Sequence, residues 1–146
     1  MMESRSPDDL PAALGRLRAS LNTAYERASG QLGLSAQQAE LLCAAMAPKP
    51  TGQLARALHC DRSNVTRMVD RASARGLMGR RSDEVDGRVT TITLTPSGRR
   101  LAQRLIAILE GQTADLRRAW PEARTRIAVD ILTEISSALE KAIHST

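Results

Sequence analysis

Apolar residues recur at helical spacing in both terminal parts of the 146-residue chain. A helix is predicted over residues 8–30, and its apolar positions are Leu10, Leu14, Leu17 and Leu21. Two more helices are predicted to begin at Pro96, capped by Thr95, and at Pro121, because proline suits the first position of a helix. Their apolar stripes are Leu101, Leu105, Ile108 and Leu109, and then Ile127, Ile131, Ile135 and Leu139.

Shorter elements are predicted between these long helices. Ser35 and Gln38 form a capping box, so a second helix is expected from there to about Met46. Thr51 is expected to cap a short third helix, and Asp61 a fourth helix that ends at Gly76. The fourth helix has an apolar stripe of Val65, Met68, Val69 and Ala72.

A β-hairpin is predicted over residues 77–82 and 88–95, with its turn at Asp86-Gly87. Ile92 and Leu94 alternate with threonines, as expected for a half-buried antiparallel strand. Arg88 lies four residues before Ile92, so it is expected on the same face of the strand but beyond the edge of the core.

The positive charge is concentrated in the middle of the chain. Residues 51–100 hold ten arginines and five acidic residues, whereas the other 96 residues hold eleven basic and eleven acidic residues. A basic segment within a neutral scaffold is typical of a protein that binds a polyanion. With one Trp, one Tyr and no Phe, the chain lacks the aromatic platform that single-stranded nucleic acid stacks on.

Other classes of protein are disfavoured by what the sequence holds. No apolar run is long enough to span a membrane, and the N-terminal stretch lacks an apolar signal region, so a cytoplasmic location is expected. Two cysteines and two histidines are too few for a disulfide framework or a zinc site. His59 and Cys60 are sequence neighbours, which do not normally face each other, and no phosphate-binding glycine loop occurs. The chain is therefore not expected to be an enzyme or to bind a cofactor.

The order helix, turn, helix, hairpin is that of a winged helix-turn-helix, in which the second helix enters the major groove of DNA. The fold class expected is mainly α, with a small β-hairpin. Asn64 and Arg67 are of the types that contact adenine and guanine edges. Asp70 is expected to pair with a neighbouring arginine, because a free carboxylate beside phosphate is unfavourable. The polar face of this helix comprises Ser63, Asn64, Thr66, Arg67, Asp70 and Arg71.

The run from Leu54 to Leu101 resembles the MarR (multiple antibiotic resistance regulator) family of bacterial transcription factors. The matching pieces are LARAL, VTRMVDRA, RGLMGRR, the Asp86-x-Arg88 pair and ITLTPSG. The resemblance implies a DNA-binding region over residues 51–95 and a helical dimerisation region over 8–46 and 96–144. It implies a homodimer on pseudo-palindromic double-stranded DNA, usually as a repressor, which a small phenolic or aromatic effector releases.

The resemblance also assigns roles to residues. Arg88 is implied to enter the minor groove, with Asp86 orienting it. The residues predicted to bind DNA are Thr51, Arg62, Ser63, Asn64, Thr66, Arg67, Arg71, Asp86 and Arg88. An effector is expected near Tyr25, His59 and Trp120, between the two layers.

Two positions depart from the family's pattern. Gly87 replaces a common arginine, and Ala72 replaces a leucine, so the packing behind the fourth helix is expected to be either looser or refilled by Met68 and Met78. Two other functions stay open: an oxidant-responsive regulator that acts through Cys43 or Cys60, and a winged-helix module for protein interaction. Cys43 is more typical of a small core residue, and Asp61 beside Cys60 disfavours a reactive thiolate.

Overall fold

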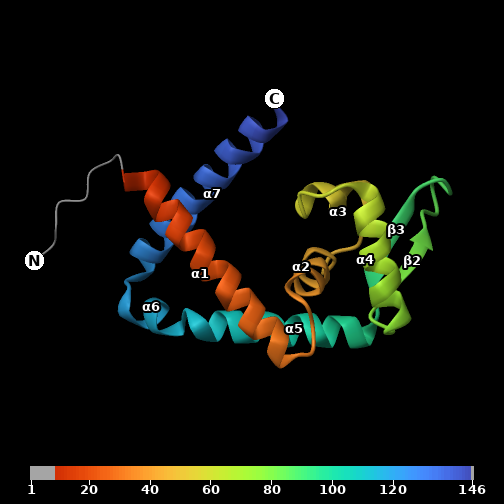
Figure 1. Ribbon diagram of the computed structural model, residues 1–146, viewed down its shortest axis with the longest axis horizontal. Coiled ribbons are helices and arrows are strands. Elements are labelled where there is room, and N and C mark those ends of the chain that lie inside the picture. Colours follow the sequence, from red (N-terminus) through yellow and green to blue (C-terminus); the bar gives the residue numbers. More distant parts are fainter. Residues whose placement is uncertain (1–8, 146) are drawn as a thin grey trace, which may run out of the picture. The chain divides into compact units, whose positions relative to one another are not determined.

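The computed structural model describes residues 9–145. These residues divide into two compact units, one that ends at Leu109 and one that begins at Glu110. Position 8 of the first predicted helix lies outside the described residues. The elements are α1 (Leu10–Gln31), α2 (Ala36–Ala44), β1 (Lys49–Pro50), α3 (Thr51–Ala57), α4 (Arg62–Ala74), β2 (Met78–Ser82), β3 (Thr90–Leu94), α5 (Pro96–Gln112), α6 (Ala114–Ala119) and α7 (Glu122–His144), as Figure 1 shows.

The predicted fold class is confirmed: the described chain is mostly helical, with a small antiparallel sheet. The capping box of α2 is formed as predicted, with Ser35 Oγ accepting from Gln38 N and Gln38 Oε1 accepting from Ser35 N. No helix within residues 9–145 is long and apolar enough to cross a membrane.

The start of α3 differs from the prediction. Thr51 is the first residue of the helix, and Pro50 takes the cap position without a side-chain hydrogen bond. Pro50 also ends the two-residue strand β1, which pairs with β3. Proline fits an edge strand because it has no backbone N–H to donate to a second neighbour.

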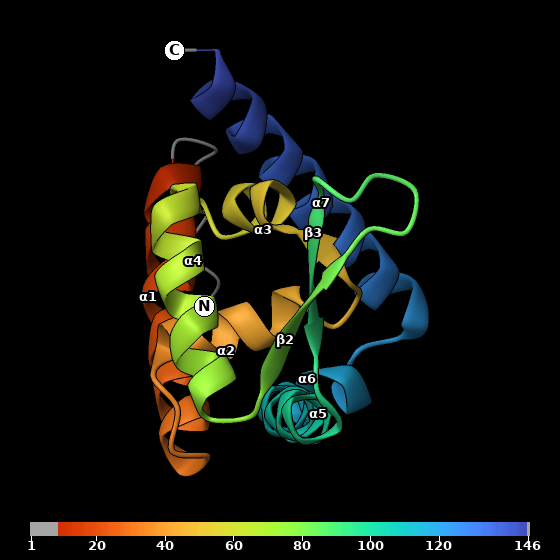
Figure 2. The same cartoon turned by 90° about the vertical axis from the view of Figure 1, so that its right-hand side faces the viewer.

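The sheet therefore has three strands, in the order β1-β3-β2, where the sequence predicted a two-stranded hairpin. β3 is central, and its Ile92 is paired with both Lys49 of β1 and Arg80 of β2. Ile92 is almost fully buried, which confirms its predicted role in the core. Viewed from the end that carries the hairpin, α4 lies beside β2 (Figure 2).

The tip of the hairpin is wider than the predicted Asp-Gly turn. The strands end at Ser82 and Thr90, so a loop of residues 83–89, here called the wing loop, connects them. Asp83 N donates to Val89 O at the base of this loop, and Val89 N donates to Asp86 O within it. Gly87 has no positive φ, so the loop does not use the glycine conformation that a two-residue turn requires.

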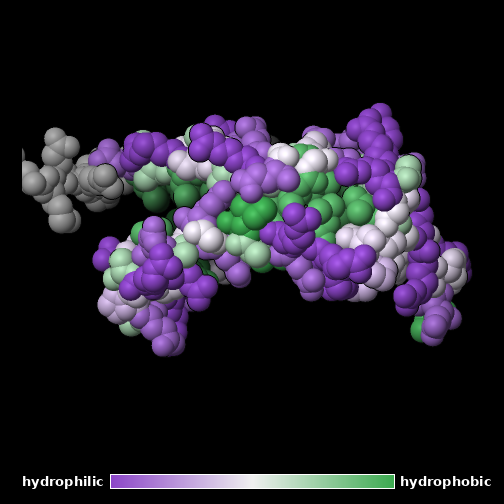
Figure 3. Space-filling view, turned by 90° about the horizontal axis from the view of Figure 1, so that it is seen from below, coloured by the Kyte–Doolittle hydropathy of each residue, from purple (hydrophilic) through white to green (hydrophobic). Residues whose placement is uncertain are grey.

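The apolar stripe of α4 packs as predicted. Its four members, Val65, Met68, Val69 and Ala72, are all buried, and α4 contacts α2, α3 and β2. Met68 and Met78 are both buried in the same core cluster as Ala72. Apolar residues of α5 also join this core, and apolar side chains gather over α5 on the face drawn in Figure 3, with hydrophilic groups around them.

A backbone junction joins the end of α4 to the start of α5. Thr95 N donates to Leu77 O, and Thr95 Oγ1 donates to Gly76 O at 2.6 Å. The same hydroxyl accepts from Gly98 N at 3.1 Å, which confirms Thr95 as the cap of α5. Gly98 lies so close to Leu77 that a Cβ there would overlap its carbonyl oxygen, so only glycine fits.

The second unit contains α6 and α7. The short helix α6 lies between the two C-terminal helices that the sequence predicted, and it was not foreseen. No residue of α7 is buried within the described chain, and much of its apolar stripe is exposed. The exposed large apolar side chains of α7 are Ile127, Val129, Ile131, Leu132, Leu139 and Ile143.

Candidate nucleic-acid interface and ligand cavity

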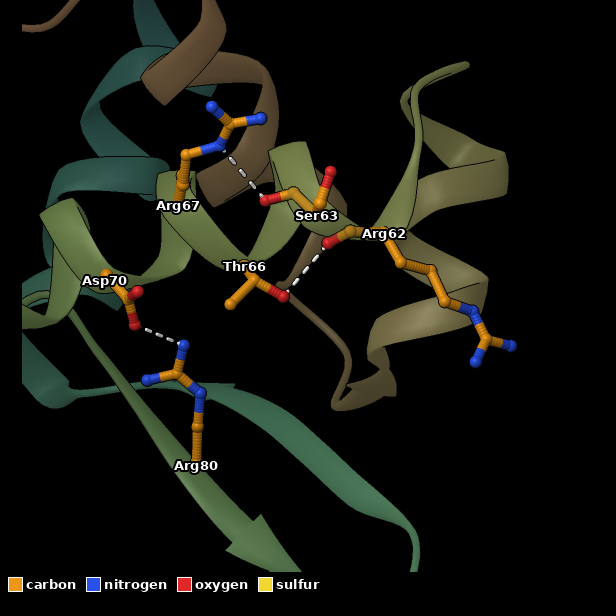
Figure 4. A network of polar contacts seen from close by, with 6 residues as sticks. All are labelled: Arg62, Ser63, Thr66, Arg67, Asp70 and Arg80. Atoms are coloured by element: carbon orange, nitrogen blue, oxygen red, sulfur yellow. Dashed lines mark hydrogen bonds and ion pairs between the residues drawn. The ribbon is translucent and has the colours of Figure 1, made fainter.

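The polar face of α4 opens to solvent on the side away from its buried stripe. Arg67 Nε lies 3.4 Å from Ser63 O, and Thr66 Oγ1 donates to Arg62 O at 2.9 Å, so both side chains lie along the helix surface (Figure 4). Asn64 is half-buried, whereas Arg71 is exposed. Apart from Asn64, the candidate residues of α4 are exposed: Arg62, Ser63, Thr66, Arg67 and Arg71.

Asp61 fixes the first turn of this helix, as predicted. Its Oδ1 accepts from Asn64 N at 2.7 Å and from Ser63 Oγ at 2.7 Å. The hydrogen bond from the Ser63 side chain, followed by that from Asn64 N, lowers the pKa of Asp61 below its ordinary 3.8. The charged Asp61 cap therefore fixes the positions of Ser63 and Asn64 in the first turn of α4.

Asp70 is paired with an arginine, as expected. Its Oδ1 lies 2.5 Å from Nη2 of Arg80, which comes from β2 (Figure 4). The pair joins the exposed side of α4 to the hairpin and leaves Asp70 with its charge balanced. Because both side chains are more than a third exposed, the pair contributes little to stability, of order 0–1 kcal/mol.

Arg88 lies in the wing loop, not on the strand where the sequence placed it. Its side chain is 96% exposed, and its Nε is 3.7 Å from Asp86 Oδ1. Asp86 Oδ1 also accepts from Arg88 N at 3.1 Å. The Asp86 carboxylate therefore restrains the backbone of Arg88, while the Arg88 guanidinium extends into solvent.

A cleft of about 460 Å³ lies between α3 and the wing loop and brings three arginines together. Arg62 comes from α4 and Arg88 from the wing loop, and both were predicted, whereas Arg56 of α3 was not. No carboxylate lines this cleft, so its charge is uniformly positive. Its lining residues are Pro50, Thr51, Gly52, Gln53, Arg56, Arg62, Arg88, Val89 and Thr90.

The approach of Arg62 to this cleft depends on Gly52. A Cβ at that position would lie 2.7 Å from Arg62 Nη2, so the guanidinium rests against the backbone of α3. Arg56 and Gln53 were missed because α3 is short and its polar positions carry no periodic signal. A count of the exposed arginines on both helices of the motif would have included Arg56.

A second cavity, of about 380 Å³, lies between α1, α2 and the end of α3; we call it the α1–α2–α3 cavity. It is lined by Leu21, Asn22, Tyr25, Glu40, Cys43, Ala44, Ala57, Leu58 and His59. Two of the three predicted effector contacts, Tyr25 and His59, thus meet here. Trp120, the third, belongs to the second unit, where the guanidinium of Arg124 lies 4.7 Å from its ring centroid.

His59 has an unusual backbone conformation at the edge of this cavity. Its φ is +51°, the one positive value for a residue other than glycine within residues 9–145. His59 N donates to Arg56 O, and Cys60 N donates to Ala55 O, so the end of α3 is a Schellman motif. The same motif ends α1 at Gly33 and α4 at Gly76, and glycine takes the positive φ in both.

Both thiols are free and half-buried. Burial, then the nearby Glu40, raises the pKa of Cys43, and burial, then Asp61, raises that of Cys60. Burial raises the pKa of Tyr25 too, with smaller contributions from Cys43 and Glu40. These groups are therefore neutral near pH 7, and neither cysteine has the electropositive surroundings of a reactive thiolate.

Comparison with known proteins finds a family model that matches part of the chain. The model of the MarR family matches residues 34–90. That segment runs from two residues before α2 through α3 and α4 to the first residue of β3. A search of curated proteins gives no significant match.

The whole described fold resembles several solved structures. CouR of Rhodococcus jostii RHA1, bound to p-coumaroyl-CoA, gives a TM-score of 0.76 at 24% identity, over 91% of this chain and 95% of CouR. NadR in complex with 4-hydroxyphenylacetate gives 0.75 at 18% identity, over 92% and 96% of the two chains. Apo MarR of E. coli gives 0.68 at 19% identity, over 86% and 96%. At these identities the likeness establishes a shared fold.

Proposed function

Because the model of the MarR family matches residues 34–90 and the fold is similar to that of MarR, we propose that the protein binds specific double-stranded DNA and regulates transcription. One observation carries the proposal: arginines lie exposed on the outer face of α4 and in the cleft beside the wing loop. The only acidic residue of α4, Asp70, is already paired with Arg80 and leaves these arginines uncompensated on that helix. A surface of this charge and shape suits the major groove and the flanking phosphates.

Different residues would read and hold the DNA. Asn64, Arg67 and Arg71 lie on the helix that would enter the major groove, where Asn suits adenine and Arg suits guanine. Arg56 and Arg62, with Thr51, line the cleft at its edge, where a phosphate fits better than a base. Arg88 extends from the wing loop and would enter the neighbouring minor groove, with Asp86 restraining the arginine where it leaves the loop.

The proposed active form is a homodimer. Its support is the apolar surface of α7, which no other part of the described chain buries. Contiguous exposed apolar surface of this kind marks an interaction site, and a second copy is the commonest partner. A two-fold dimer would present two copies of α4 to half-sites about 10 bp apart on a pseudo-palindrome.

We propose further that the protein is a repressor, in the bacterial cytoplasm with its DNA, and that a small effector releases it. The support is the α1–α2–α3 cavity, whose volume lies in the range that small molecules occupy. CouR and NadR, which share the fold, hold p-coumaroyl-CoA and 4-hydroxyphenylacetate respectively. A regulator triggered by cysteine oxidation is less well supported, because the pKa values of both thiols are raised.

Selection of bound DNA from a random pool tests the proposal most directly. We expect a palindromic consensus with half-sites about one helical turn apart. Enrichment of no sequence would contradict specific DNA recognition. Such a result would favour the alternative of a protein-interaction module, although the outer face of α4 is polar and basic rather than apolar.

A further inference from the structure

The α1–α2–α3 cavity has an unusual charge for a site that would take a phenolic acid. Among its lining residues the one carboxylate is that of Glu40. Neither arginine nor lysine lines the cavity. Lys49 is hydrogen-bonded to the backbone of a lining residue, Ala44, but its own side chain is not part of the wall.

The carboxylate of Glu40 is also available to a ligand. None of the four ion pairs found within residues 9–145 involves it. Its charge is nevertheless felt inside the cavity, because it raises the pKa of both Tyr25 and Cys43. An anionic ligand placed beside these groups would be repelled, and a cation would be attracted.

The rest of the wall suits an apolar ligand body with a few polar contacts. Leu21, Ala44 and Leu58 supply apolar surface from three different elements. Tyr25, Asn22 and His59 can donate or accept hydrogen bonds around it.

The conformation of His59 is a second, independent sign that this wall is built for a ligand. Glycine takes the positive φ in the two other motifs of the same geometry, whereas here an imidazole is held at the cavity edge at a cost in backbone strain. Strained residues of this kind gather at ligand sites, where the side chain compensates for the cost.

From this geometry we propose that the cavity binds a small organic cation, an amine with an apolar or aromatic body, whose positive charge pairs with Glu40 while His59 contacts its other end. The inference rests on the proposed function in one respect: the amine would be the effector of the DNA-binding protein. It departs from the phenolic acid that a comparison with NadR suggests.

Three probes that share a hydroxyphenyl ring test the charge alone. Tyramine is a cation, 4-hydroxyphenethyl alcohol is neutral and 4-hydroxyphenylacetate is an anion. Binding to the full chain is measured by calorimetry at pH 8. We expect tyramine to bind at least about tenfold more tightly than 4-hydroxyphenylacetate, with the alcohol between them.

Substitution of Glu40 assigns the preference to one residue. Glu40→Gln keeps the size and removes the charge, and we expect it to reduce the preference for tyramine about tenfold. Glu26→Gln, also exposed but outside the cavity lining, is the matched control and should leave the preference unchanged. Equal preferences in wild type and Glu40→Gln would overturn the proposal, as would tighter binding of the anion or no binding of any probe.

The outcome is separable from that for DNA binding. Protein that selects a palindrome but binds none of the probes contradicts only the inference about the cavity. Protein that binds tyramine through Glu40 but selects no DNA contradicts only the proposed function.

Discussion

His59 adopts a backbone conformation that glycine adopts at two other helix ends in this chain. Since a side chain at positive φ is strained, we expect His59→Gly to raise the free energy of unfolding by up to about 1 kcal/mol. The same variant should bind tyramine more weakly, because it loses a contact at the cavity edge. Urea unfolding and calorimetry measure the two effects.

The control for this prediction is Gly76→Ala, at a φ of +73° with open space around the missing Cβ. It should lower the free energy of unfolding by about 1 kcal/mol through backbone strain alone. A His59→Gly variant less stable than wild type would show that the imidazole contributes to folding and is not kept for a ligand.

Arg67 and Arg56 are expected to make different kinds of contact with DNA. Arg67→Ala should cost about 1–3 kcal/mol on the selected sequence and relax specificity at one base position, because Arg67 lies on the exposed face of the helix that is proposed to enter the major groove. Arg56→Ala should weaken binding to all sequences alike and reduce the slope of log affinity against log salt by about one.

Titration of labelled DNA at several salt concentrations distinguishes these two roles. Arg18→Ala, an exposed arginine of α1 outside the proposed interface, should change neither affinity nor slope. A sequence-independent loss for Arg67→Ala would mean that it contacts phosphate only.

At the scale of elements, the start of α4 depends on an ionised cap. The pKa of Asp61 is lower in the folded chain than its ordinary value, so the unfolded chain binds the proton more readily. The stability from this cap is therefore present above about pH 4 and is lost as pH falls through the lowered pKa. We expect Asp61→Asn, which keeps a neutral cap, to lose less stability than wild type between pH 7 and pH 3.

Urea unfolding at the two pH values checks this expectation. Asp115→Asn removes an exposed carboxylate of α6, outside α4. Its loss of stability between pH 7 and pH 3 should equal that of wild type, apart from the small effect of its weak ion pair with Arg118. If the acid sensitivity of Asp61→Asn equals that of wild type, the cap hydrogen bonds do not depend on the charge of Asp61.

The junction between α4 and α5 predicts a large effect from one methyl group. Gly98→Ala places a Cβ against the Leu77 carbonyl, so we expect a loss of at least about 1–3 kcal/mol in the free energy of unfolding. Gly111→Ala in the same helix meets nothing within 4 Å and should raise it by up to about 1 kcal/mol, through helix propensity. Thermal and urea unfolding of the two variants would contradict the prediction if both changed stability in the same direction.

Elements with strong periodicity or specific caps were predictable from the sequence. The buried stripe of α4 and the caps Ser35, Asp61 and Thr95 all follow from local chemistry, and the structure has them. Strand β1 was not predictable, because two residues carry no period. The wing loop was predicted too tight, since Asp-Gly marks a turn but does not set where the strands stop.

In the candidate site, too, the residues fixed by local sequence were predictable, and those fixed by tertiary packing were not. Residues on α4 could be assigned to its outer face from helical geometry alone, and the pairing of Asp70 followed from charge. That the partner is Arg80 and that Arg56 lines the cleft could not be predicted from the sequence. Both depend on how the hairpin and α3 pack against their neighbours. The charge of the α1–α2–α3 cavity also depends on packing, since Glu40 lies 15 residues after Tyr25 and 19 before His59.

At the scale of the whole molecule, α7 is expected to hold two copies together. Ile131→Glu puts a charge into the exposed apolar stripe, so we expect the mass measured by light scattering to fall from dimer to monomer. Affinity for the palindrome should fall as well, because two half-sites would no longer be bound by one assembly. Val85→Glu, at an exposed apolar residue of the wing loop, is the control and should leave the mass unchanged.

The junction at Thr95 and Gly98 also bears on how a signal could travel. The residues just after α4, the end of β3 and the first turn of α5 are tied by a main-chain hydrogen bond of Thr95, by two hydrogen bonds of the Thr95 hydroxyl and by a glycine with no room for a side chain. These three segments cannot slide past one another without breaking those bonds. A change in the direction of α5 would therefore be transmitted to α4 as a rigid rotation of the two helices together.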